Sequence, residues 1–152
     1  KGWARAWRHT GLREVAFVTA VRDTQSEIEG LSADVPNADW AALDEREFAY
    51  DRVPLVDHAN TVIYEIPAGK HTAASATHPI LLSFLDVVVQ GYLTEFGEAG
   101  AMRFFDTTQG WDAPILNDRA APIYPRHQTL SADEISFVDH ALVTLNCTIL
   151  KP

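Results

Sequence analysis

The sequence predicts a single domain of the α+β class, with strands in its first half and helices in its second. Short runs of β-branched and aromatic residues, bounded by turn residues, are concentrated before residue 67. After that point apolar residues recur at the spacing of a buried helical face, most clearly over residues 135–145. The 152 residues are enough for one ordinary domain with a core of its own.

The predicted strands are short and follow one another closely. Residues 15–21 are an apolar run typical of a buried strand, and residues 27–35 alternate well enough to form a hairpin with it. Residues 53–56 and 61–66 are the next two strands, joined by a turn at residues 57–60. These segments supply the β part of the predicted fold.

The helices are predicted from their end signals as well as from their spacing. Asn37 is expected to cap a short helix over residues 38–48. A long helix is expected over residues 79–96, followed after Gly97 by a second helix. Ser131 and Glu134 have the spacing of a capping box, so the last helix should begin there.

Charge and composition limit the partners. The formal net charge is −9, with 21 acidic and 12 basic residues, and no Lys/Arg stripe offsets it, so nucleic acid is not expected to bind. No apolar run is long enough to span a membrane. The single cysteine, Cys147, excludes an internal disulfide and a cysteine-based zinc site, which favours a cytoplasmic protein. The helix at residues 79–96 either covers the sheet or makes a homodimer contact.

The six histidines are scattered along the sequence without the close spacing of metal ligands. We therefore expect no metal site.

The most informative stretch is residues 43–53, LDEREFAYDRV. In it a short helix ends in a carboxylate, Glu47, and a strand then begins with Tyr50 and Arg52. The stretch resembles the LD-x-x-E…Y-x-R signature of the γ-glutamylcyclotransferase superfamily. Residues 2–7, GWARAW, are similar to an early strand of that family. The order of the other expected elements also matches, so the resemblance covers most of the chain.

The resemblance implies a small mixed β-barrel flanked by C-terminal helices, with an acidic residue at the barrel mouth. It also implies a cofactor-independent reaction in which a γ-glutamyl amide or peptide cyclises to 5-oxoproline and releases an amine. Glu47 matches the catalytic position and would act as general acid and base, partly shielded from water by Phe48 and Tyr50. Tyr50 and Tyr64 match positions that line the substrate pocket, and Arg46 and Arg52 are candidates to hold a substrate carboxylate.

The family also has a Tyr-Gly-Ser-like loop after its first strand, whose backbone N–H groups bind substrate. The sequence holds no such loop, and we expect this loop and the strand before it to precede Lys1. One alternative is a binding or interaction module that keeps the fold without turnover. Another is a different acyl-transfer or hydrolytic reaction at the same site.

The residues alone, without the resemblance, support a plainer interpretation. Glu47 would be a solvated surface acid, and Arg46 and Arg52 would be surface charges or partners of Asp44 and Asp51. Asp86, an acid on an otherwise apolar helix, could face the mouth of the implied barrel, but in the plainer interpretation it is a helix cap or pairs with a Lys or Arg.

Overall fold

The structure is a computed structural model that describes residues 1–56 and 58–152, and it has the α+β class expected from the sequence. Its helices and strands follow one another as β1 (Trp3–His9), β2 (Phe17–Arg22), a 3-10 turn (Pro36–Ala38), α1 (Trp40–Arg46), β3 (Asp51–Pro54), β4 (Val62–Glu65), β5 (Thr72–Ala73), β6 (Ile80–Leu81), α2 (Leu82–Asp106), β7 (Thr108–Gln109), β8 (Ile115–Leu116), α3 (Ala132–Thr144) and β9 (Ile149–Leu150).

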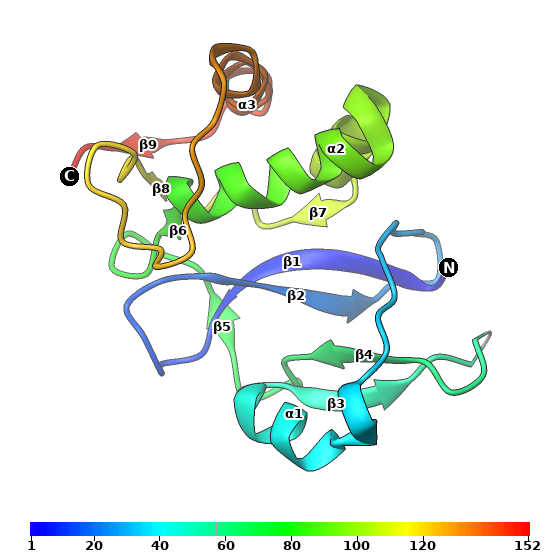
Figure 1. Cartoon of the computed structure of the whole chain (residues 1–152). Coiled ribbons are helices and arrows are strands. Elements are labelled where there is room, and N and C mark those ends of the chain that lie inside the picture. The colour runs from blue at the N-terminus through cyan, green and yellow to red at the C-terminus, as the bar shows by residue number, and fades with distance from the viewer. Residues whose placement is uncertain (57) are drawn as a thin grey trace.

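The elements form two halves on either side of the β1–β2 pair (Figure 1). The helices α2 and α3 lie on one side, and the β3–β4 hairpin with α1 lies on the other. β1 pairs with β2 and β5 antiparallel and with β7 parallel, whereas β3 and β4 form a separate two-stranded sheet. The Ile66 N–H donates to Thr19 Oγ1 at 2.7 Å and so ties the end of β4 to β2. In the described part of the chain, strand pairing does not close into a ring.

A third sheet was not expected from the sequence. β6, β8 and β9 are two residues each and pair in parallel, with α2 and α3 in the connections between them. This sheet explains why the long helix begins at Leu82 and not at Pro79, because the backbone of the intervening residues is engaged in pairing with β8.

The predicted hairpin of residues 15–21 with residues 27–35 is wrong. β2 pairs instead with β1, from Trp3 opposite Arg22 to Arg8 opposite Phe17, and residues 27–35 form no strand. Glu29 shows the physical reason, because its carbonyl oxygen accepts hydrogen bonds from Arg5 Nη2 at 2.5 Å and from the Tyr92 hydroxyl at 2.7 Å. Side chains therefore take the place that a neighbouring strand would have had.

Two helix starts show how well local signals worked. Asn37 does not cap α1: it lies within the 3-10 turn at φ 55°, and Asp39 accepts the capping bond from the Ala42 N–H at 3.1 Å. The capping box of α3 is confirmed, since Ser131 Oγ accepts from the Glu134 N–H at 3.2 Å and Glu134 accepts from the Ser131 N–H at 2.6 Å.

Two other local predictions have different outcomes. Gly97 interrupts α2 as expected, with φ 65°, a value that glycine adopts without steric cost. The turn predicted at residues 57–60 is seen from His58 onward, where the Thr61 N–H donates to the His58 carbonyl at 3.1 Å. Asp57 lies outside the described residues.

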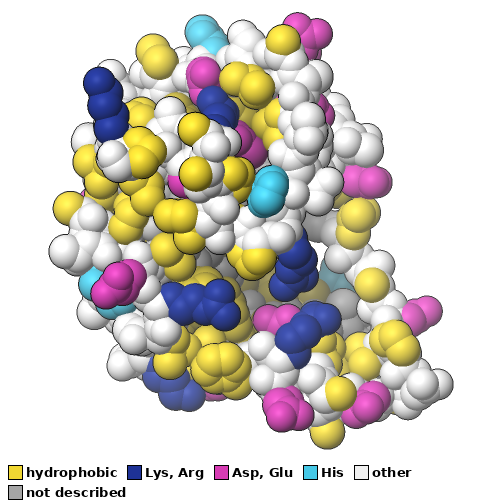
Figure 2. Space-filling view, turned by 60° about the vertical axis from the view of Figure 1, so that its left-hand side comes forward, with side chains coloured by type: hydrophobic (Ala, Val, Ile, Leu, Met, Phe, Trp, Pro, Cys, Tyr) yellow, Lys and Arg dark blue, Asp and Glu magenta, His cyan; other side chains and the backbone are white. Residues whose placement is uncertain are grey.

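The core lies between β1, α2 and α3. Its largest fully buried side chains include Trp7, Phe104 and Phe105, which pack with Trp111 in edge-on and tilted aromatic pairs. Over the described residues, none of the helices is long and apolar enough to cross a membrane. The surface is not smooth: Figure 2 shows it hollowed between its upper and lower parts, with Lys or Arg side chains beside the hollow.

Candidate functional site

Glu47 lies immediately after the last residue of α1, at the C-cap position. Its N–H donates to the Leu43 carbonyl at 2.9 Å and its carbonyl accepts from the Tyr50 N–H at 2.7 Å, so its backbone is fixed on both sides. The side chain is 28% exposed, and its carboxylate pairs with Arg46 at 2.9 Å. A negative charge at a helix C-terminus is unfavourable with respect to the helix dipole, and Arg46 offsets it.

Two tyrosine hydroxyls lie within electrostatic range of Glu47. Burial, followed by the charge of Glu47, raises the pKa of Tyr50 to about 12, and its hydroxyl donates to the Val18 carbonyl at 3.2 Å. Burial also raises the pKa of Tyr64 to about 12, with further contributions from Asp44 and Glu47. Both phenols are therefore protonated at neutral pH and act as hydrogen-bond donors.

Asp44 and Arg52 fasten α1 to the β3–β4 hairpin. Asp44 accepts a hydrogen bond of 2.6 Å from the Tyr64 hydroxyl and pairs with Arg52 at 3.4 Å. Arg52 lies opposite Tyr64 in the strand register, and its guanidinium is 4.6 Å from the centre of the Trp40 ring. The structure thus pairs Arg52 with Asp44, and both proposed carboxylate anchors have a partner within the chain.

Of the two neighbours expected to shield Glu47 from water, one is partly buried and the other is exposed. Tyr50 is partly buried, as expected, but Phe48 is 72% exposed and faces water. The difference arises because α1 ends at Arg46, so Phe48 falls in a turn after the helix and not on its packed face.

Residues of this region line two cavities. One, of about 810 Å³, is bounded by Trp40, Leu43 and Tyr64 and by the residues 28–35 that cross over it. The other, of about 530 Å³, is bounded by Phe48 and Ala49 and by residues 9–12 and 69–72. Glu47 is not among the lining residues of either cavity, but the chain on its two sides lines one cavity each.

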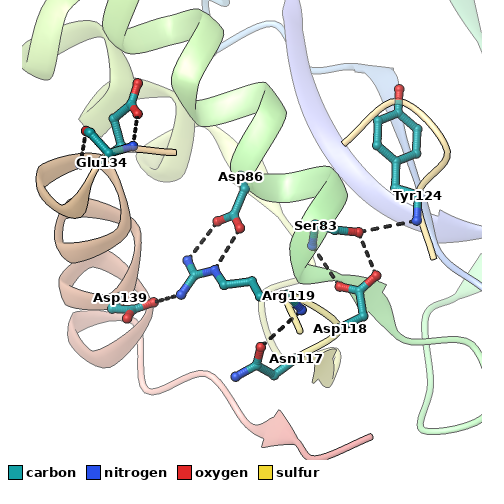
Figure 3. Close-up of polar contacts among 9 residues, drawn as sticks. Ser83, Asp86, Asn117, Asp118, Arg119, Tyr124, Glu134 and Asp139 are labelled. Atoms are coloured by element: carbon teal, nitrogen blue, oxygen red, sulfur yellow. Dashed lines mark hydrogen bonds and ion pairs between the residues drawn. The ribbon is translucent and has the colours of Figure 1, made fainter. Parts of the chain in front are cut away.

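A second polar cluster joins α2, α3 and the segment between them (Figure 3). Arg119 Nε and Nη2 donate to the two carboxylate oxygens of Asp86 at 2.7 Å each, and Arg119 Nη1 donates to Asp139 at 2.6 Å. Burial alone would lower the pKa of Arg119, but hydrogen bonds and charges of both carboxylates raise it. Asp86 is thus paired with an arginine, in agreement with one of the two plainer interpretations.

Asp118 completes this cluster at the start of α2. It is 2% exposed and accepts hydrogen bonds from the Ser83 N–H at 2.8 Å, from Ser83 Oγ at 2.6 Å and from the Ile123 N–H at 2.9 Å. A carboxylate at a helix N-terminus satisfies free N–H groups and is favoured by the helix dipole. Each of these buried charges has its partners within the fold, so the cluster holds α2 and α3 in place.

Three of the six histidines, which looked scattered in the sequence, lie at one corner of the molecule. The rings of His9 and His78 stack with their centres 3.3 Å apart, and His9 and His71 both line the smaller cavity. The sequence carried no signal for this, because β1, β5 and the residues before β6 meet only in the tertiary structure. Within residues 1–56 and 58–152, no group of three metal-ligating side chains is arranged to hold an ion.

Comparisons with protein-family models, curated proteins and solved structures found no match to this chain.

Proposed function

We propose that the protein catalyses a γ-glutamylcyclotransferase-type reaction, in which a γ-glutamyl amide or peptide cyclises to 5-oxoproline and an amine is released. One observation carries the proposal. Glu47, the residue that the sequence resemblance picks out as general acid and base, is a partly exposed carboxylate in electrostatic range of two protonated tyrosines, one of which, Tyr64, lines the larger cavity.

The reaction needs little from the protein beyond placement and proton transfer. The α-amine of the substrate attacks its own γ-carbonyl, a carbon–nitrogen bond closes the five-membered ring, and the amide bond to the leaving amine breaks. Glu47 takes the proton from the attacking ammonium and returns a proton to the leaving nitrogen. The Tyr50 and Tyr64 hydroxyls are donors for the oxyanion or for the substrate carboxylate.

To bind substrate, Arg46 and Arg52 must leave their present partners, Glu47 and Asp44, and the free-energy cost is small because these ion pairs are partly exposed. Arg46 is 68% exposed, and surface ion pairs contribute only about 0–1 kcal/mol. Arg46 therefore leaves Glu47 at little cost when a substrate carboxylate offers a second partner. Arg52, 35% exposed in its pair with Asp44, is the second cation for that carboxylate.

The proposed barrel is incomplete, because strand pairing among the described residues does not close into a ring. The β1–β2 and β3–β4 pairs would form its walls, tied together by the bond from Ile66 to Thr19, and α1 would lie at its mouth. The larger cavity, with Tyr64 and Trp40 in its wall, would receive the γ-glutamyl group.

A binding module without turnover is the second candidate. It is favoured by the hydroxyls of Tyr50 and Tyr64, which already donate to Val18 and Asp44 and would have to give up those bonds to hold an oxyanion.

The experiment that separates the two candidates measures 5-oxoproline released from a panel of γ-glutamyl amides and peptides. We compare the unaltered protein with Glu47→Gln and with the matched control Glu45→Gln, which removes an exposed acid of α1. Loss of a general base lowers the rate by about 100-fold or more, whereas Glu45→Gln leaves it unchanged. No release from any substrate, or equal rates in both variants, would refute the enzyme.

A further inference from the structure

The smaller cavity differs in character from the rest of this acidic protein. It lies where the end of β1, the residues after α1 and residues 69–72 meet. Its volume of about 530 Å³ is within the range of roughly 300–1,000 Å³ typical of small-molecule sites. The residues assigned above to the γ-glutamyl reaction do not line this cavity, although Phe48 and Ala49, which follow Glu47 in the chain, do. We therefore treat it as a separate site.

Basic side chains gather here although the chain carries a net charge of −9. Lys70, His9 and His71 line the cavity, Arg8 is within electrostatic range of His71, and the ring of His78 stacks on that of His9. We call these five residues the basic corner. They come from three separate segments, so the fold and not a local sequence run brings these basic side chains together.

One acidic residue, Asp51, is paired with the basic corner, and that pair is weak. Asp51 pairs with Lys70 at 3.5 Å, but both side chains are more than half exposed, so the pair is easily exchanged. Glu47, which precedes Phe48 in the chain but does not line the cavity, is paired with Arg46. Lys70 can therefore exchange Asp51 for an anionic ligand at little cost.

The histidines differ in what they have to offer. His9 is fully engaged, since its Nε2 accepts from the Gly11 N–H at 3.0 Å and its Nδ1 lies 3.2 Å from Thr72 Oγ1. For His71, no ring hydrogen bond is found in the part of the chain that the structure describes. Burial, followed by the charge of Arg8, lowers the pKa of His71, and a nearby anion would counter both effects and favour the charged ring.

The other wall of the cavity is apolar. Leu12 is 51% exposed and Phe48 is 72% exposed, and both large side chains border the opening. Exposed apolar residues at the lip of a cationic cavity favour a ligand that has an apolar body and one anionic end.

We propose that this cavity binds a small organic carboxylate, with the carboxylate against Lys70 and His71 and the apolar body against Leu12 and Phe48. The site is distinct from the one that contains Glu47, and its occupation does not depend on the γ-glutamyl reaction.

The test is a titration followed by NMR of the histidine ring signals and by calorimetry, using phenylbutyrate and its uncharged analogue phenylbutanol. Phenylbutyrate should bind with saturation, shift the ring signals of His9 and His71, and bind about tenfold or more tightly than the alcohol. Lys70→Gln should remove most of that preference and leave the alcohol unaffected. Lys151→Gln, an exposed lysine at the other end of the chain, should change neither.

Phe48→Ala provides the complementary arm, because it should weaken the acid and the alcohol alike. Lys70 and Phe48 are both largely exposed, so neither substitution should affect folding, which a thermal melt of each variant checks. Equal affinity for the two compounds, a Lys70→Gln variant that keeps the preference, or ring shifts confined to other histidines would overturn the proposal. Unchanged binding in Glu47→Gln is required as well.

Discussion

Removing Arg119 should destabilise the fold far more than removing its exposed partner, Asp139. The guanidinium makes two bonds of 2.7 Å to Asp86 and one of 2.6 Å to Asp139. The Asp86 side chain is 6% exposed and that of Asp139 is 54% exposed, so one guanidinium joins a buried carboxylate to a solvated one. This asymmetry sets the expected magnitudes.

Arg119→Met keeps the length of the side chain and leaves the Asp86 carboxylate buried without its partner. Loss of one member of a buried pair typically costs about 3–5 kcal/mol, a large part of the roughly 5–15 kcal/mol that stabilises a domain. Asp139→Asn removes only an exposed pair and should cost no more than about 1 kcal/mol. Replacing both members, in Asp86→Leu with Arg119→Met, removes the unpaired charge and should recover much of the loss.

Urea denaturation followed by tryptophan fluorescence and by circular dichroism gives the free energy of unfolding for each variant. The two probes should agree if unfolding is two-state. Equal losses for Arg119→Met and Asp139→Asn would refute the argument, because they would mean that burial of Asp86 does not decide the cost. A double variant that loses as much unfolding free energy as Asp86→Leu and Arg119→Met lose together when measured singly would refute the coupling between these two side chains.

Two further predictions concern a helix cap and pH. Ser131→Ala removes the side chain that accepts from the Glu134 N–H and should lower the free energy of unfolding by about 1 kcal/mol. Ser136→Ala, at an exposed site inside α3, should have little effect or stabilise slightly. Equal urea midpoints for the two variants would contradict this prediction. Burial lowers the pKa of His9 and His71 in the folded state, with further contributions from His78 and Arg8 respectively, so the unfolded chain binds more protons between the two sets of pKa values. Stability should therefore fall as the pH drops from about 7 toward 5, before the carboxylates begin to titrate, and His71→Gln should reduce this dependence. Unfolding free energies that stay constant over that range in the unaltered protein would rule out the histidine contribution.

Features governed by a few neighbouring residues were predictable from the sequence. The capping box at Ser131, the break at Gly97 and the presence of a short helix all depend on local backbone chemistry, although that helix spans Trp40–Arg46 and not the expected residues 38–48. The α+β class followed from the order of apolar patterns. Pairing of Asp86 with a Lys or Arg was one of the interpretations that the sequence left open, because an acid on an apolar helix needs a cation when it is buried.

Features governed by distant residues were not predictable. β6, β8 and β9 have two residues each, too few for any periodicity, and the pairing arises from the packing of α2 and α3. Residues 27–35 alternate like a strand, but Arg5 and Tyr92 take the Glu29 carbonyl and Arg103 binds its carboxylate at 2.7 and 2.9 Å. The stacking of His9 on His78 joins residues far apart in sequence, so no spacing rule detects it.

The two halves of the molecule differ in how their charges are held, and this difference bears on where the proposed reaction would take place. In the α2–α3 half, Asp86 and Asp118 are buried and fully hydrogen-bonded, so exchanging their partners for a ligand would leave buried groups unpaired. In the α1 half, Glu47 and Asp51 are held by exposed Arg46 and Lys70, pairs that water and a ligand can replace at a cost of about 1 kcal/mol or less. Both cavities adjoin this second half. Ligand binding and proton transfer require groups that change partners readily, so the α1 half is where substitutions should alter activity, and the α2–α3 half is where they should alter stability.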